Sequence, residues 1–179
     1  MEIVGRSRAL AELLVSPLGR RWRHVHAVAD RAQRLCGVVD GEGDILVAAA
    51  WLHDVGYAPE VRKTGFHALD GARYLRDDGY PDRIVCLVAH HSGARFEAKE
   101  RGFEGELAVF ELEDSPVMDA LITADLTTAP DGSACTYDQR IDEVLARYPV
   151  DHPVYRTWSK AREVIGASVR RTEERLANL

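Results

Sequence analysis

Apolar residues recur at intervals of three and four along almost the whole chain, and this spacing constrains the fold more than any other feature of the sequence. Ser115 followed by Pro116 is typical of a helix start. Asp44 is expected to cap another helix, and Gly56 is expected to end that helix. No pair of segments alternates apolar and polar residues as β-strands do. The pattern predicts an all-α helical bundle, with helices over residues 7–15, 23–36, 43–56, 66–78, 82–91, 115–128, 136–148 and 154–176 and a loop or ragged helix over 94–106.

The length of 179 residues is enough for one domain with a proper core, so we expect residues 1–179 to form a single domain. The formal net charge of −6 argues against binding of nucleic-acid polymers, which needs a basic surface. No stretch reaches the roughly 18 to 20 apolar residues that cross a bilayer. The N-terminus lacks the apolar segment of a signal peptide, so we expect a cytoplasmic protein without membrane contact.

The histidines are concentrated in one part of the sequence. Six of the seven fall between residues 24 and 91, and four separate predicted helices each carry at least one of them. His24 lies on the apolar stripe of its helix, His53 ends an alanine-rich segment, and Asp125 follows the apolar run "ALITA". His26 and His152 have the polar surroundings of a helix surface and a turn, so we expect no metal contact from them.

Several buried histidines and aspartates would each need a polar partner, and a bound metal satisfies them together. Imidazole and carboxylate ligands suit Fe, Mn, Zn or Ni, and the absence of a CxxC motif argues against a structural zinc site. Asp54 directly follows His53 near the end of a helix. Its two oxygens can each face one ion, so Asp54 is the natural bridging ligand of a binuclear site.

The motifs "RWRHVHAVA", "AAWLHDVG" and "LITADLTT" carry a resemblance to a known family. They place His24, the pair His53-Asp54, and Asp125 in the order that resembles the HD superfamily of metal-dependent phosphohydrolases. The resemblance runs over about residues 20–130, which would form the metal-binding core, and it implies a single HD-domain, phosphodiesterase-like bundle completed by C-terminal helices over about 137–177.

Two further histidines resemble ligands of the binuclear branch of this family. "GFHALDGARYL" contains His67 and "AHHSGA" contains His91, with the neighbouring His90 either supporting the site or replacing His91 as the ligand. The resemblance implies one or two divalent ions, Fe or Mn first and Ni, Co or Zn as alternatives. Two features depart from the branch: Tyr57 stands where many members have the lysine of HDxGK, and no GYP triad follows the double histidine.

The resemblance implies hydrolysis of a phosphoester or phosphoanhydride in a small molecule, with a nucleotide as the expected substrate. Asp54 would help to activate a bridging water, and His67 or His90 would move a proton. Phosphate contacts are expected from Arg95, Lys99 and Arg140.

Two alternatives stay open, a di-iron oxygenase that cleaves a C–C or C–P bond and an HD domain that binds a nucleotide without turnover. A small phosphorylated molecule is the expected partner, and a homodimer is left open.

Overall fold

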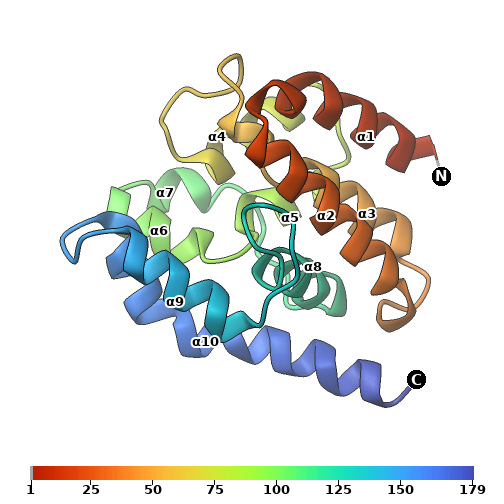
Figure 1. Ribbon diagram of the computed structural model, residues 1–179. Helices are drawn as coiled ribbons and strands as arrows, with labels where there is room; N and C mark the ends of the chain where they lie inside the picture. The colour runs from red at the N-terminus through yellow and green to blue at the C-terminus, as the bar shows by residue number, and fades with distance from the viewer. Residues whose placement is uncertain (1) are drawn as a thin grey trace.

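The computed structural model describes residues 2–179, and in this range it contains ten α-helices, three short 3-10 helices and no β-strand (Figure 1). The all-α fold class is therefore confirmed. The helices are α1 Glu2–Val15, α2 Arg20–Arg34, α3 Gly43–Leu52, α4 His67–Asp77, α5 Asp82–His90, α6 Ala94–Arg101, α7 Glu104–Leu107, α8 Pro116–Leu126, α9 Tyr137–Arg147 and α10 Pro153–Ala177. The 3-10 helices are η1 Ser16–Leu18, η2 Cys36–Val38 and η3 Val55–Tyr57.

Helix α3 forms the centre of the bundle. Every residue from Leu46 to Leu52 is buried, and α3 packs against α1, α2, α5 and α8. Three consecutive alanines, Ala48 to Ala50, keep the helix narrow enough for neighbours on several sides. The segment that precedes His53 is therefore fixed by packing in all directions, which fixes the position of His53 itself.

The C-terminal helices cover the other side of the bundle. Helix α10 packs against α8, α9 and α6, and α9 lies beside it (blue in Figure 1). The buried Asp119 on α8 accepts hydrogen bonds from Arg171 and Arg175 on α10, at 2.8 Å from Arg171 Nε and 2.8 Å from Arg175 Nη1. This ion-pair group fastens α10 to the helix that carries Asp125.

Most helix boundaries differ from the predicted ones by a few residues, and the largest differences are in α1, α2 and α3. Helix α1 already begins at Glu2, and Ser7 is a buried residue inside it. Asp44 does not cap α3: it lies in the first turn, because the helix begins at Gly43. Helix α3 ends at Leu52, four residues before Gly56, which lies in η3.

Gly56 does not end a helix, as predicted, but lies where η3 approaches the backbone of α4 closely. A Cβ atom at this position would lie 1.9 Å from the carbonyl oxygen of His67, so only glycine permits the close contact between η3 and α4.

Other predicted boundaries are confirmed. Ser115 caps α8, accepting a hydrogen bond from Met118 N, and Pro116 is the first residue of that helix. The segment 94–106, predicted as a loop or ragged helix, is mostly helical: it contains α6 and all of α7 except its last residue, Leu107. Within the part of the chain that is described, no helix combines the length and the apolar character that a membrane crossing requires.

Candidate metal centre

The six predicted metal ligands lie together, and five of them lie at helix ends. His53 and Asp54 directly follow α3, His67 begins α4, His91 directly follows α5, Asp125 lies in the last turn of α8, and His24 lies within α2. The carboxyl-terminal ends of α3, α5 and α8 thus meet at this point. Helix carboxyl ends carry partial negative charge, which favours a cation there.

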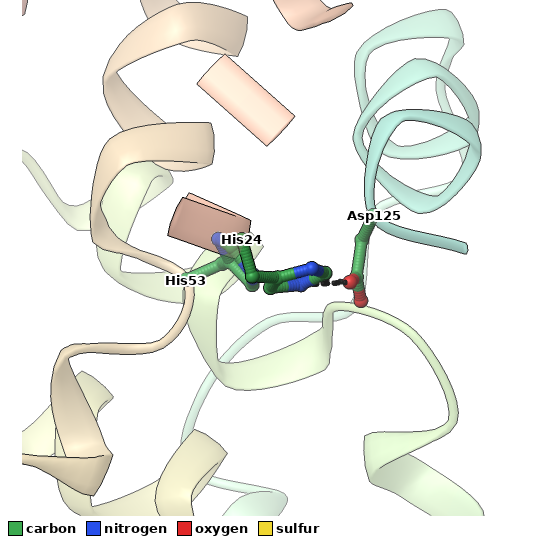
Figure 2. A group of neighbouring side chains, drawn as sticks. All are labelled: His24, His53 and Asp125. Carbon is green, nitrogen blue, oxygen red and sulfur yellow. Dashed lines mark hydrogen bonds and ion pairs between the residues drawn. The ribbon is translucent and has the colours of Figure 1, made fainter. Parts of the chain in front are cut away.

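The first group of ligand atoms belongs to His24, His53 and Asp125 (Figure 2). His24 Nε2 lies 3.0 Å from Asp125 Oδ1, and His53 Nε2 lies 3.8 Å from the same oxygen. All three side chains are buried and come from three different helix segments. The three ligand atoms lie within 4.8 Å of one another, so one ion can contact all of them.

The second group contains Asp54, His67 and His91. The Nε2 atoms of His67 and His91 lie 3.1 Å apart. Asp54 lies between the two groups: its Oδ2 is 3.4 Å from His53 Nε2, and its Oδ1 is 3.6 Å from His67 Nε2. Each carboxylate oxygen therefore faces a different group, which is the arrangement that a bridging ligand needs.

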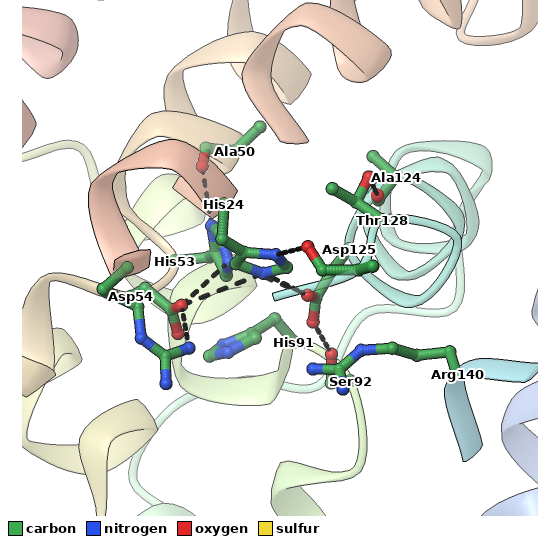
Figure 3. A network of polar contacts seen from close by, with 12 residues as sticks. His24, Ala50, His53, Asp54, His91, Ser92, Ala124, Asp125, Thr128 and Arg140 are labelled. Carbon is green, nitrogen blue, oxygen red and sulfur yellow. Dashed lines mark hydrogen bonds and ion pairs between the residues drawn. The ribbon is translucent and has the colours of Figure 1, made fainter. Parts of the chain in front are cut away.

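Hydrogen bonds to backbone carbonyls orient three of the four imidazoles, and Figure 3 shows the one between His53 and Ala50. A carbonyl can only accept, so each Nδ1 carries the proton and, in the neutral ring, Nε2 keeps its lone pair for the centre. The bonds run from His24 Nδ1 to Ala129 O at 3.1 Å, from His53 Nδ1 to Ala50 O at 2.7 Å and from His91 Nδ1 to Val88 O at 2.6 Å.

The chemistry of these residues fits divalent metal ions. Among the described atoms, the buried Nε2 of His53 has no hydrogen-bond partner. The facing Nε2 atoms of His67 and His91 can share only one proton between them. Unpaired buried nitrogens are costly, and an ion at each group would bind all of them. Imidazole and carboxylate together suit Fe, Mn, Zn, Co or Ni.

The two carboxylates of the centre are held in their charged form. Burial alone would raise the pKa of Asp125, but the contact with His24 Nε2 at 3.0 Å and the charge of His53 hold it well below its usual range. Burial would also raise the pKa of Asp54, but the charges of Arg21 and His53 have a larger effect and lower this pKa. Both side chains therefore offer charged oxygens at neutral pH.

His53 differs from His67 and His91 in the direction of its pKa shift. Burial lowers the pKa of His53, but the carboxylates of Asp54 and Asp125 raise it to about 9. Burial lowers the pKa of His67 to about 3, despite the opposing charge of Asp54, and also lowers that of His91. Without metal, His53 therefore carries a proton at neutral pH, which an incoming ion has to displace. His67 is neutral and ready to bind.

Arg21 and Tyr57 lie beside the second group. Arg21 Nη1 donates a hydrogen bond to Asp54 Oδ2 at 2.7 Å, and its guanidinium lies 4.0 Å from the centre of the Tyr57 ring. The Tyr57 ring in turn stacks on His67. The sequence identified Tyr57 only as a departure from a lysine, because its contacts join segments that are far apart in the chain.

Ser92 is a site residue that the sequence did not reveal as one. Its hydroxyl donates to Asp125 Oδ2, on the carboxylate whose other oxygen faces the histidines. Its backbone has φ of 55°, a left-handed conformation that costs about 1–3 kcal/mol in a residue other than glycine. The only signal was the "HHSG" motif, in which a small hydroxyl residue follows the histidines.

A cavity of about 290 Å³ opens onto both groups. Arg140, one of the predicted phosphate contacts, lines it, and Figure 3 shows its side chain extending from α9 toward Ser92. Arg101 and Arg147, which were not predicted, line it as well. The size is at the lower end of the range for small-molecule sites.

Three predicted site residues lie elsewhere. Arg95 and Lys99 are exposed on α6 and do not line this cavity. His90 is the last residue of α5, and its Nε2 bonds to Phe110 O at 2.9 Å, away from the metal ligands. His90 lines a second cavity together with Arg95.

The protein is an all-α bundle in which histidines and aspartates form two groups of potential metal ligands. These two features place it in the class of helical metal-binding domains. A comparison with protein families matches residues 21–123, more than half of the chain, to the HD domain. The chain therefore belongs to the HD domain family, and membership of this family fits a metal-dependent hydrolase in general. Five of the six ligands lie within the matched residues, and Asp125 follows two residues after them.

Curated relatives share a shorter segment. The chain is 34% identical over 77 residues to the tRNA (cytidine(56)-2'-O)-methyltransferase of Thermoplasma volcanium, and 35% identical over 80 residues to that of Picrophilus torridus. These segments are 43% and 44% of this chain, and in each case 22% of the relative. The chain thus spans about a fifth of the length of these relatives. No solved structure matches it significantly.

Proposed function

We propose that this protein is a metal-dependent phosphohydrolase that acts on a phosphoester or phosphoanhydride of a small molecule. The observation that carries the proposal is the position of Asp54, with one oxygen toward the His24 and His53 pair and the other toward His67. A carboxylate in this position would hold an ion at each of its oxygens, and two divalent ions would supply the chemistry used for phosphoryl transfer. Fe or Mn is the proposed metal.

The chain's own groups divide the work of the site. Bound divalent ions supply Lewis acidity, which lowers the pKa of water and polarises phosphoryl oxygens. Arg21 and Ser92 hold the carboxylates of Asp54 and Asp125 in place. Arg140 offers a charged guanidinium to a phosphoryl group: its side chain is only 12% exposed, and its buried Nε is without a partner among the atoms described.

A di-iron oxygenase is the second candidate. The same ligand groups could hold two irons, and Tyr57 stands at the lysine position and contacts His67. Oxygen consumption separates the two functions, because hydrolysis requires none. Methyl transfer is not part of the proposed function, because the shared segments cover only 22% of the named methyltransferases.

The test is a screen for phosphate release. Protein purified without oxygen and loaded with Fe(II) or Mn(II) is assayed on nucleotides, dinucleoside polyphosphates and simple phosphoesters, beside His53→Ala and the control His26→Ala. His26 is a half-exposed histidine on α2 outside both groups. We expect release with the wild type and His26→Ala and none with His53→Ala. Oxygen uptake without phosphate release, or a full rate in His53→Ala, would contradict the proposal.

A further inference from the structure

The cavity has a second wall, which differs in chemistry from the metal ligands. Helix α9, the turn after it and the start of α10 contribute this wall, with Tyr148, His152, Val154 and Trp158 among its side chains. These are aromatic and apolar groups. A sugar phosphate or another purely polar ligand would leave them facing hydroxyl groups or water, at the cost of their hydrophobic burial.

The rings of Tyr148 and His152 form a stacked pair, with ring centroids 4.5 Å apart and planes 25° apart. Each ring is attached at the end of a helix: Tyr148 directly follows α9, and His152 caps α10. His152 Nδ1 accepts a hydrogen bond from Val154 N at 3.2 Å, which fixes the orientation of the imidazole. A surface that is ordered before binding loses little entropy when a ligand arrives.

The charge of this wall suits an anion joined to such a ring. Arg140 and Arg147 both pair with Glu143, so two positive charges share one negative charge. An anionic group beside Arg140 would place the remainder of a small ligand along the same wall, where the stacked rings lie.

Resting on the proposed phosphohydrolase function, we infer that Tyr148 and His152 bind a planar ring of the substrate. The substrate class is then a phosphoester that carries a flat unsaturated ring, a nucleobase or an aryl group, stacked on this pair. Both residues lie beyond the residues 21–123 that match the HD domain. The specificity is thus supplied by this chain's own C-terminal part.

The test measures binding without turnover. Phosphonates have a P–C bond that phosphoester hydrolysis does not cleave, so titration calorimetry without oxygen can compare phenylphosphonate, adenosine 5'-methylenephosphonate and cyclohexylphosphonate. Cyclohexylphosphonate has a ring of similar size that is not flat. We expect at least one of the two planar ligands to bind about ten-fold more tightly than cyclohexylphosphonate, as expected for stacking of one ring. Which of them does so distinguishes an aryl group from a nucleobase.

Variants locate the effect. Tyr148→Ala should abolish the preference, whereas Tyr148→Phe, which keeps the ring, and Tyr155→Ala, which removes a ring outside the cavity, should retain it. Thermal unfolding checks that each variant is folded, and His152→Ala offers a second variant that should lose the preference. Equal binding of all three ligands, or an unchanged preference in folded Tyr148→Ala, would overturn the inference. A failed phosphate-release screen overturns the proposed function but leaves this measurement valid.

Discussion

The ring of Tyr57 lies almost parallel to the imidazole of His67, with centroids 4.2 Å apart and planes 16° apart. Arg21 lies over the same tyrosine ring and donates a hydrogen bond to Asp54. Tyr57 thus connects the arginine that orients Asp54 to the histidine that faces the other oxygen of Asp54. It is a positioning residue for the second group, although it offers no ligand atom.

Replacing Tyr57 should therefore weaken metal binding at the second group. Tyr57→Ala removes the ring that limits rotation of His67, and loss of such a supporting contact typically costs about 10–100-fold in metal affinity. Tyr57→Phe keeps the ring and should bind nearly as the wild type does. Equilibrium competition with a chelator, read by metal analysis, gives both affinities. An unchanged affinity in Tyr57→Ala would show that His67 is held by other contacts.

Asp54→Asn should be more damaging than loss of either histidine of the second group. Asparagine has nearly the same size but offers one neutral oxygen, so both ions lose a charged ligand. His67→Ala or His91→Ala should leave the first group intact and retain about one ion per chain. Metal stoichiometry and turnover of the three variants test this order. Full metal content and rate in Asp54→Asn would make Asp54 a structural carboxylate.

Gly56→Ala should disturb the fold next to the centre. The added methyl group would lie 1.9 Å from His67 O and 2.8 Å from Gly71 N, both backbone atoms, so α4 must move. We expect a loss of about 1–3 kcal/mol or more in the free energy of unfolding, measured by urea denaturation.

Gly5→Ala is the matched control for this substitution. Nothing lies within 4 Å of its added Cβ, and helix α1 should gain up to about 1 kcal/mol. If Gly56→Ala and Gly5→Ala had equal free energies of unfolding, the close contact between Gly56 and α4 would be contradicted.

The ion-pair group of Asp119 should make stability depend on acid pH. Burial raises its pKa, but hydrogen bonds from Arg171 and Arg175 outweigh burial and lower the pKa below its usual range. A carboxyl with a lower pKa in the folded state stabilises the fold above its unfolded pKa of about 3.9. That contribution is lost as the pH falls from there through the folded pKa.

Asp119→Asn should therefore lower the unfolding free energy at pH 7 by about 1–3 kcal/mol, and the difference from the wild type should shrink below about pH 4. The control Asp138→Asn breaks the ion pair between Asp138 and Arg162. The Asp138 side chain is 75% exposed, so this substitution should change the unfolding free energy little. Urea denaturation at several pH values measures both. If the difference in unfolding free energy between the wild type and Asp119→Asn stayed constant down to pH 2, the lost stability would come from packing and not from the charge of Asp119.

The helix class could be read from the sequence because it depends on local periodicity, whereas the ligands were identified from their apolar surroundings together with the resemblance of their motifs to the HD superfamily. A histidine or aspartate on an apolar segment is buried and needs a polar partner, which a metal ion can provide. The structure brings the ligand atoms of His24, His53 and Asp125 within 4.8 Å of one another. The choice between His90 and His91 depended on where α5 ends. The helix stops at His90, and the extended backbone of His91 turns its ring toward His67.

Contacts between distant segments could not be predicted in this way. Arg95 and Lys99 were expected to reach the substrate because they are cations that follow the double histidine, but α6 presents them to solvent. The stacking of Tyr57 on His67 and the bond from Ser92 to Asp125 depend on how separate elements pack. No periodicity within one segment encodes such a contact.

All six candidate metal ligands come before residue 126, whereas the aromatic and basic wall of the cavity comes from residues 140–158. Substitutions in this later part can change which molecule fits without removing a single metal ligand. New substrate ranges can thus arise by drift in α9, the following turn and the start of α10 while the metal chemistry stays the same. The same separation makes these segments the place to exchange when the selectivity of the protein is to be redesigned.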